Sequence, residues 1–378
     1  MAGKTATTAP DLGEEQVLVL QGGGALGAYQ AGAYETLSQS GIEPEWLAGI
    51  SIGAINAALI AGNPPGRRAA RLAEFWETVT SSTALWAPLL WPLGRGAMNE
   101  AHAGRALAVG VPGFFIPRVP PPTLRLPASA GARSYYDTAP LRETLLRLVD
   151  FDYLNAEGPR LSVGAVNVET GNMTWFDSAR HAVGPEHVMA SGALPPGFPP
   201  VEIDGALYWD GGLVSNSPLH YVLDEEATGA DTCLFQIDLF SARGAVPATV
   251  WDAETRIKDI RYSSRTRFNT DMMRRMYEFA EAAQRLQDKL PEELRDDPDL
   301  QALTGLKLAP RLTIVHLIYR QAQYERHSKD YEFSRLSMRD HWDAGARDVT
   351  ETLANADWTE RKRRGGPVKV FDLTRDSR

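Results

Sequence analysis

Cysteine is nearly absent from this sequence, which holds a single one, Cys233, among 378 residues. One cysteine cannot form an intrachain disulfide, so the fold must depend on packing alone. Cys233 stands at the start of an apolar run, residues 233–239, where we expect a small buried hydrophobe. A chain without a disulfide framework is typical of a reducing compartment, and we predict a cytoplasmic location.

Long apolar runs are absent as well. No stretch reaches the ~18–20 apolar residues that a membrane-spanning helix needs. Residues 1–15 are small and polar and contain no apolar core of a signal peptide, so we interpret them as a disordered lead-in. These features predict a chain that is in solution or bound to the periphery of a membrane.

Positive charge is in deficit, since 39 Lys and Arg face 48 Asp and Glu and the formal net charge is −9. Binding to nucleic acid depends largely on neutralising phosphates with basic side chains. We therefore expect no nucleic-acid partner.

Short apolar strands alternate with helical segments, and this order predicts an α/β fold with a largely parallel sheet. The expected strands are residues 17–20, 46–50, 234–239 and 312–319, and the expected helices are 28–39, 52–61, 66–81 and 141–148. Two hairpins are expected, at residues 161–176 and at 201–208, where Asp204-Gly205 suits a tight turn.

Two regions differ from this pattern. Residues 82–132 are so rich in proline that we expect an irregular cap or lid. Residues 251–305 and 321–353 are charged with helical periodicity. We divide the chain into a catalytic domain over residues 16–240 and a charged, mainly helical extension over 241–378.

The pentapeptide Gly49-Ile50-Ser51-Ile52-Gly53 lies between a predicted strand and a predicted helix. A nucleophile elbow requires this context. Its turn is so tight that side chains two residues away from the serine would collide, which explains Gly49 and Gly53. The serine lies at the positive end of the helix, where developing negative charge is stabilised. Ser51 is therefore a candidate nucleophile.

A glycine run, Gly22-Gly23-Gly24-Ala25-Leu26-Gly27, follows the first predicted strand. Unhindered backbone N–H groups before a helix bind anions. One interpretation is the pyrophosphate of a dinucleotide, with Glu43 or Glu45 on the ribose. The other is the oxyanion of a tetrahedral intermediate. The elbow at Ser51 favours the oxyanion, because a dinucleotide fold has no use for one there.

The tripeptide Asp210-Gly211-Gly212 follows the second hairpin. Two glycines after an aspartate let the backbone approach another element closely. We expect that element to be the elbow at Ser51. An ordinary turn is the alternative interpretation, and it is the one we adopt for Asp204-Gly205.

A nucleophilic serine needs a base, and a hydrolase triad would place a histidine after Asp210 in the chain. The candidates are His220, His316, His327 and His341. None lies in a loop after a strand, where a triad histidine usually lies. We interpret all four as structural and keep a triad esterase as an alternative.

In this order, the glycine run, the elbow and Asp210-Gly211-Gly212 resemble the patatin-like phospholipase family. Residues 136–141 and 190–200 also resemble family segments. The resemblance covers residues 16–240 and fades beyond. The remainder is similar to an extension found in a bacterial subgroup.

The resemblance implies a three-layer α/β/α fold and a serine lipid acyl-ester hydrolase, of phospholipase A or lipase type. It implies a dyad without histidine, in which Ser51 attacks the ester, Asp210 takes its proton and an acyl-enzyme forms. We expect no metal and no other cofactor. The implied oxyanion donors are the amides of Gly22, Gly23, Gly24 and Ala25, and the implied supporting residues are Gly27, Gly49, Gly53, Gly211 and Gly212.

The chain departs from the family at Leu26, where a lysine or arginine often stands. Its absence removes a positive charge and weakens the expectation of a phospholipid headgroup preference. Residues 82–132 are a candidate for membrane contact, with an ordinary packed insertion as the alternative. The basic run 361–364 is a second candidate, with a solvated run of charges as the alternative. A scaffold without catalysis is the remaining alternative.

Overall fold

The structure, a computed structural model, describes residues 13–80, 94–127, 129–225, 230–264, 266–291, 294, 297–304, 311–322, 324–361 and 368–372. Most of the predicted lead-in, the first part of the 82–132 segment and most of the basic run 361–364 lie outside the described residues.

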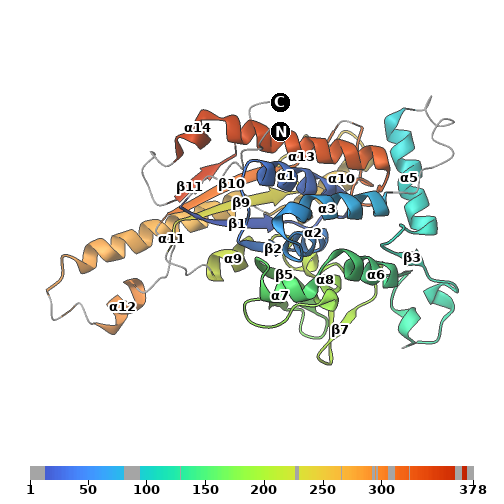
Figure 1. Ribbon diagram of the computed structural model, residues 1–378, viewed down its shortest axis with the longest axis horizontal. Helices are drawn as coiled ribbons and strands as arrows, with labels where there is room; N and C mark the ends of the chain where they lie inside the picture. The colour runs from blue at the N-terminus through green and yellow to red at the C-terminus, as the bar shows by residue number, and fades with distance from the viewer. Residues whose placement is uncertain are drawn as a thin grey trace, which may run out of the picture.

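A nine-stranded sheet forms the centre of the molecule, with strand order β11-β10-β9-β1-β2-β5-β8-β7 and β6 beside β5 (Figure 1). All pairings from β11 to β5 are parallel, whereas β6, β7 and β8 pair antiparallel. A short pair, β3 with β4, lies apart from this sheet. The strands are β1 (Glu15–Leu20), β2 (Trp46–Gly49), β3 (Ile116–Pro117), β4 (Tyr136–Asp137), β5 (Arg160–Asn167), β6 (Met173–Asp177), β7 (Val201–Ile203), β8 (Ala206–Asp210), β9 (Thr232–Asp238), β10 (Leu312–Ile318) and β11 (Val368–Phe371).

Helices cover both faces of the sheet. Their bounds are α1 (Ala28–Gln39), α2 (Ile52–Ala61), α3 (Pro65–Val79), α5 (Arg95–Val109), α6 (Ala139–Leu148), α7 (Phe151–Ala156), α8 (Pro185–Ser191), α9 (Leu219–Glu225), α10 (Val250–Tyr262), α11 (Thr266–Gln287), α12 (Pro298–Thr304), α13 (Arg335–Ala354) and α14 (Ala356–Thr359). Single 3₁₀ turns occur at η1 (Gly24–Gly27), η3 (Pro122–Leu124), η4 (Ala130–Ala132) and η5 (Gly211–Leu213).

Alternate side chains of β1 enter two separate cores, because successive residues of a strand face opposite sides of a sheet. Leu18 and Leu20 pack into the core that contains residues of α1, α2, α3 and α13. Val17 and Val19 pack into a second core with residues of α9 and α11. The three-layer α/β/α fold predicted from the sequence is therefore confirmed.

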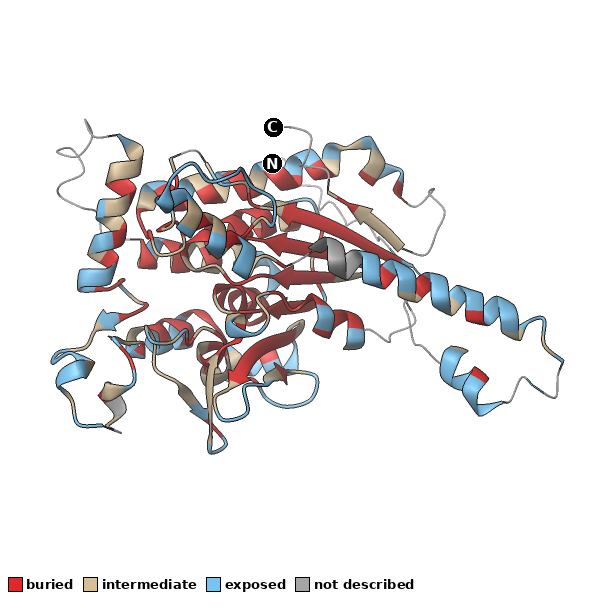
Figure 2. Ribbon diagram, turned by 180° about the vertical axis from the view of Figure 1, so that it is seen from behind, coloured by how far each residue is buried: buried red, intermediate tan, exposed pale blue. Residues whose placement is uncertain are grey.

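The strands β10 and β11 extend the same sheet beyond β9, and α13 packs against α1 on one of its faces. Figure 2 shows the central strands of the sheet buried, whereas α11 and α12 project from the body and carry many exposed residues. Residues beyond 240 are thus an integral part of the central layer and of both outer layers, since α13 packs on one face of the sheet and α11 on the other. In the described part of the chain, no helix has the length and apolarity to cross a membrane.

Two expectations from the sequence are wrong in part. The segment 82–132 was expected to be irregular, but residues 95–109 form α5. No proline stands between Pro92 and Pro112, so nothing in that stretch interrupts a helix.

The second correction concerns residues 321–353, expected to be helical throughout. The helix α13 begins only at Arg335, where the side chain of Ser334 caps it by accepting from the N–H of Ser337. The preceding described residues form a looped segment of turns. Its charged side chains Glu325, Lys329 and Glu332 are buried, so they do not form the solvated face of a helix.

Candidate active site

Ser51 stands on a sharp turn between β2 and α2. Its backbone has φ 55° and ψ −122°, a left-handed conformation that is uncommon for a residue with a side chain. The amide of Ser51 donates to the hydroxyl of Ser191 over 3.0 Å, and that hydroxyl donates to the carbonyl of Gly164 over 2.7 Å. The buried Ser191 therefore holds the turn in place from α8.

Glycine is required on both sides of this turn. A Cβ on Gly49 would lie 2.4 Å from the carbonyl oxygen of Gly53, and one on Gly53 would lie 2.3 Å from that of Leu20. Both distances are shorter than any real contact of a Cβ atom. The close approach of β1, β2 and α2 thus depends on residues without side chains.

Asp210 ends β8, where β8 pairs with β5, and its carboxyl lines the same cavity as Ser51. The amide of Gly212 donates to Asp210 Oδ1 over 2.7 Å. Burial raises the pKa of Asp210 to about 6, and the neighbouring Ser51 hydroxyl and Gly212 amide lower it by less. The carboxyl is ionised at neutral pH and is a better proton acceptor than an exposed aspartate.

The glycines after Asp210 permit this arrangement. A Cβ on Gly211 would lie 2.5 Å from the carbonyl oxygen of Gly164, and one on Gly212 would lie 2.9 Å from Asn216 Oδ1. The turn can therefore pack directly on β5 while its amide binds the carboxylate.

The glycine run connects β1 to α1 and lies beside Ser51, since a Cβ on Gly22 would be 3.1 Å from the Cβ of Ser51. Two of the four amides expected to bind an oxyanion already have acceptors. Gly22 donates to the carbonyl of Asn216 over 3.2 Å, and Ala25 donates to the carbonyl of Asp330 over 2.8 Å.

The amides of Gly23 and Gly24 have no acceptor within the described part of the chain. Gly24 has φ +55°, which suits glycine, and Asp330 lies so close that a Cβ here would be 2.0 Å from its carbonyl oxygen. Gly27 packs against α2, with Ile52 2.5 Å from the position of a Cβ. The expectation for the oxyanion site therefore narrows to Gly23 and Gly24.

One cavity of about 330 Å³ brings these groups together. Ser51, Asp210, Gly22, Gly23, Gly24 and Gly212 all contribute to its lining. The rest of the wall is mainly apolar and aromatic, with Ile55, Leu107, Phe114, Phe115, Tyr136, Leu194, Phe198, Phe240 and Phe333. A polar reactive end thus meets an apolar chamber, as in a site for a molecule with an acyl chain.

No histidine is among the described residues that line this cavity. His316 is buried in β10, and burial lowers its pKa to about 4. His341 Nε2 is 2.6 Å from Glu325 Oε1, and His327 contacts the hydroxyl of Tyr331. His220 lies in the first turn of α9. These positions give the triad alternative no histidine at the cavity.

Several residues of the cavity wall belong to no motif that could be recognised in the sequence. Asn216 donates to the carbonyl of Gly22 over 3.0 Å, and Tyr262, at the end of α10, faces the same cavity. Burial first, and then the charge of Asp210, raise the pKa of Tyr262, so its phenol stays protonated. Asp330 and Tyr331 come from the looped segment before α13.

The dinucleotide interpretation loses Glu43, one of its two candidate ribose-binding acids. Glu43 pairs with Arg68 at 2.6 Å and accepts hydrogen bonds from Tyr34 and Ser38. Its carboxylate is therefore engaged within the fold. No cluster of three or more side chains suited to a metal ion occurs among the described residues.

Comparison of the chain with known proteins identifies its family. A family profile described as patatin-like phospholipase matches residues 18–223, more than half of the chain, and one described as patatin phospholipase matches residues 260–365. Among solved structures, VipD from Legionella pneumophila is similar with a TM-score of 0.37 at 13% sequence identity, over 96% of this chain and 72% of that chain. No curated protein sequence matches the chain.

Proposed function

Because the chain belongs to the patatin-like phospholipase family, whose members are lipid acyl hydrolases, we propose that it cleaves acyl esters of lipids with Ser51 as nucleophile and Asp210 as base. The observation that supports this most directly is that Ser51 and Asp210 line the same cavity, where the Gly212 amide binds the carboxylate and the described lining contains no histidine.

In the first half of the reaction, Ser51 Oγ attacks the ester carbonyl carbon while Asp210 accepts the hydroxyl proton. The carbonyl oxygen becomes an oxyanion and is stabilised by the free amides of Gly23 and Gly24. When the tetrahedral intermediate collapses, the bond to the alkoxy oxygen breaks and Asp210 returns the proton to the leaving alcohol. The acyl group remains esterified to Ser51.

In the second half, a water molecule attacks the acyl-enzyme and gives its proton to Asp210. The same amides stabilise the second oxyanion, and collapse regenerates the Ser51 hydroxyl and releases the fatty acid. A carboxylate with a pKa of about 6 is a weak base toward a hydroxyl, so most of the acceleration must come from positioning and from the oxyanion site.

The walls of the cavity indicate the substrate class. Its aromatic side chains suit an aliphatic chain better than a polar acyl group. The side chain of Leu26 is fully buried, and no charge stands at that position in the glycine run. We therefore propose that the acyl chain contributes more to recognition than the headgroup does.

The test is hydrolysis of p-nitrophenyl esters of short and long chains and of a mixed phospholipid panel by wild type, Ser51→Ala and Asp210→Asn. Both variants should lose activity by about 10⁴-fold while keeping the wild-type fold, because a nucleophile and its base act as one unit. Asp343→Asn, an exposed position on α13, is the matched control and should keep full activity.

Full activity of Asp210→Asn would reject the dyad and require a histidine. A wild-type protein that cleaves no ester of the panel would favour a scaffold without catalysis. Labelling of wild type, but not of Ser51→Ala, by a fluorophosphonate would separately report whether Ser51 is reactive.

A further inference from the structure

The helix α10 and the looped segment before α13 lie directly against the glycine run. The carbonyl of Asp330 accepts from the amide of Ala25, and the same oxygen would be 2.0 Å from a Cβ on Gly24. The position of this one carbonyl therefore determines the orientation of the peptide that follows Gly24.

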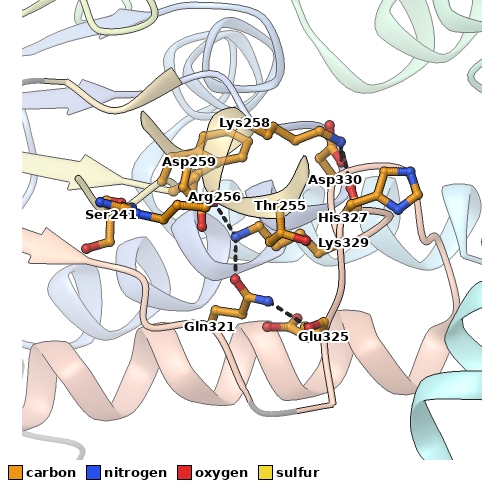
Figure 3. A network of polar contacts seen from close by, with 12 residues as sticks. Ser241, Thr255, Arg256, Lys258, Asp259, Gln321, Glu325, His327, Lys329 and Asp330 are labelled. Atoms are coloured by element: carbon orange, nitrogen blue, oxygen red, sulfur yellow. Dashed lines mark hydrogen bonds and ion pairs between the residues drawn. The ribbon is translucent and has the colours of Figure 1, made fainter. Parts of the chain in front are cut away.

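Two ion pairs attach this segment crosswise to consecutive residues of α10 (Figure 3). Lys258 Nζ lies 2.7 Å from Asp330 Oδ1 and also donates to the carbonyl of His327 over 2.6 Å. Asp259 Oδ1 lies 2.6 Å from Lys329 Nζ. Each helix residue thus binds one of the two adjacent residues 329 and 330.

These pairs are partly or wholly removed from water. The side chain of Lys329 is 2% exposed and that of Lys258 is 19% exposed. Lys329 Nζ also donates to Gln321 Oε1 over 2.9 Å. Hydrogen-bonded ion pairs of this burial restrict geometry much more than surface pairs do.

The last residue of α10, one turn after Lys258 and Asp259, contacts the start of the glycine run. The carbonyl of Tyr262 accepts from Gln21 Nε2 and from Asn216 Nδ2, each over 2.9 Å. Asn216 Nδ2 also donates to the carbonyl of Gly22. One helix therefore supports the run at two places, through Gln21 and Asn216 at its start and through Asp330 at Ala25.

We propose that Lys258 is a positioning residue for the reaction: by binding Asp330, it holds the carbonyl that orients the amides of Gly23 and Gly24 toward the oxyanion. This inference rests on the proposed function of the site. It assigns to the chain beyond residue 240 the task of completing the oxyanion site.

The expected effect follows from the distance dependence of hydrogen bonds. Removal of one oxyanion donor commonly lowers kcat by about 10²–10³-fold. Loss of Lys258 misplaces the donors without removing them, so we expect a decrease in kcat of about tenfold. Because the bound ester carries no oxyanion, and one develops only in the transition state and the tetrahedral intermediate, KM should change little.

The experiment compares wild type, Lys258→Met and Lys258→Arg, with Lys369→Met as matched control. Lys369 is a partly buried lysine of β11 that donates to the carbonyl of Arg361, and β10 and β9 separate it from β1. Three quantities are measured: kcat and KM for one ester, inhibition by a trifluoromethyl ketone with the same acyl chain, and amide hydrogen exchange of residues 22–28.

In Lys258→Met we expect the fall in kcat and faster amide exchange in residues 22–28. We also expect a similar weakening of inhibition by the ketone, because its adduct with Ser51 carries an oxyanion. Lys258→Arg should recover most of the loss, and Lys369→Met should match wild type in all three measurements. Unchanged exchange in Lys258→Met would overturn the proposal, as would an equal loss of kcat in Lys369→Met.

The exchange measurement needs no substrate. If the wild-type protein hydrolyses no ester, the proposed function fails, and hydrogen exchange alone then decides whether Lys258 supports the glycine run.

Discussion

Asp210→Asn should make the folded protein more stable at neutral pH while it abolishes hydrolysis. The folded carboxyl has a pKa of about 6 against an ordinary value of 3.8, because burial penalises its charged form. A pKa raised on folding contributes stability below pH 4, and this contribution is lost as pH rises through 6. The difference of about two units corresponds to about 3 kcal/mol at pH 7. Asparagine never ionises, and its side-chain oxygen can still accept from Gly212.

The assay is thermal unfolding of wild type and Asp210→Asn across the range from about pH 4 to pH 8. With an unfolding entropy of about 2.1 cal/mol/K per residue over 378 residues, about 3 kcal/mol corresponds to a Tm shift of about 4 °C. The Tm difference between variant and wild type should grow by that amount between about pH 4 and pH 7 and then stay constant. The exposed Asp343→Asn should show no such trend. A difference that is independent of pH, or that grows toward acid, would refute the argument that Asp210 is held as a strained carboxylate.

Three further predictions concern the site and the elbow. The value of kcat/KM should fall about tenfold per pH unit below about pH 6 as Asp210 protonates, and a profile flat to pH 5 would exclude Asp210 as base. Ser191→Ala should destabilise the protein by about 1–3 kcal/mol and lower kcat, because the Ser51 amide and the Gly164 carbonyl both lose the Ser191 hydroxyl as a partner. Denaturation measures the first effect and steady-state kinetics the second. Gly53→Ala should lower the free energy of unfolding by about 3 kcal/mol or more, since its Cβ would lie 2.3 Å from the Leu20 carbonyl oxygen. Gly104→Ala, on the exposed face of α5, should raise it by about 0.5–1 kcal/mol. Equal effects of the two substitutions in urea denaturation would contradict the steric argument.

The catalytic candidates could be predicted because each motif is short and its constraint is local. The elbow needs glycine within two residues of Ser51, and contacts at Gly49 and Gly53 show why. The same holds for the alternation of apolar residues in β1, whose two faces enter two cores. Patterns of this kind depend on backbone geometry that a few neighbouring residues determine.

The remainder of the site depends on contacts between residues far apart in the chain. The amides of Gly22 and Ala25 could not be distinguished from those of Gly23 and Gly24 by sequence, because their acceptors belong to Asn216 and to the segment before α13. That segment was interpreted as part of a charged helix over residues 321–353. It forms turns instead, and its Lys329 pairs with Asp259 of α10, a partner that cannot be read from local periodicity.

The pairing of Ala25 with Asp330 has a consequence for biosynthesis. Gly22, Ser51 and Asp210 emerge from the ribosome long before Asp330, so a nascent chain carries the proposed nucleophile and base while the glycine run still lacks its contact with Asp330. On the proposed mechanism, hydrolysis would reach its full rate only after Asp330 has been synthesised and β10 has joined the sheet. A polypeptide truncated at residue 240 would likewise lack that contact, so the order of synthesis itself would delay the proposed hydrolysis.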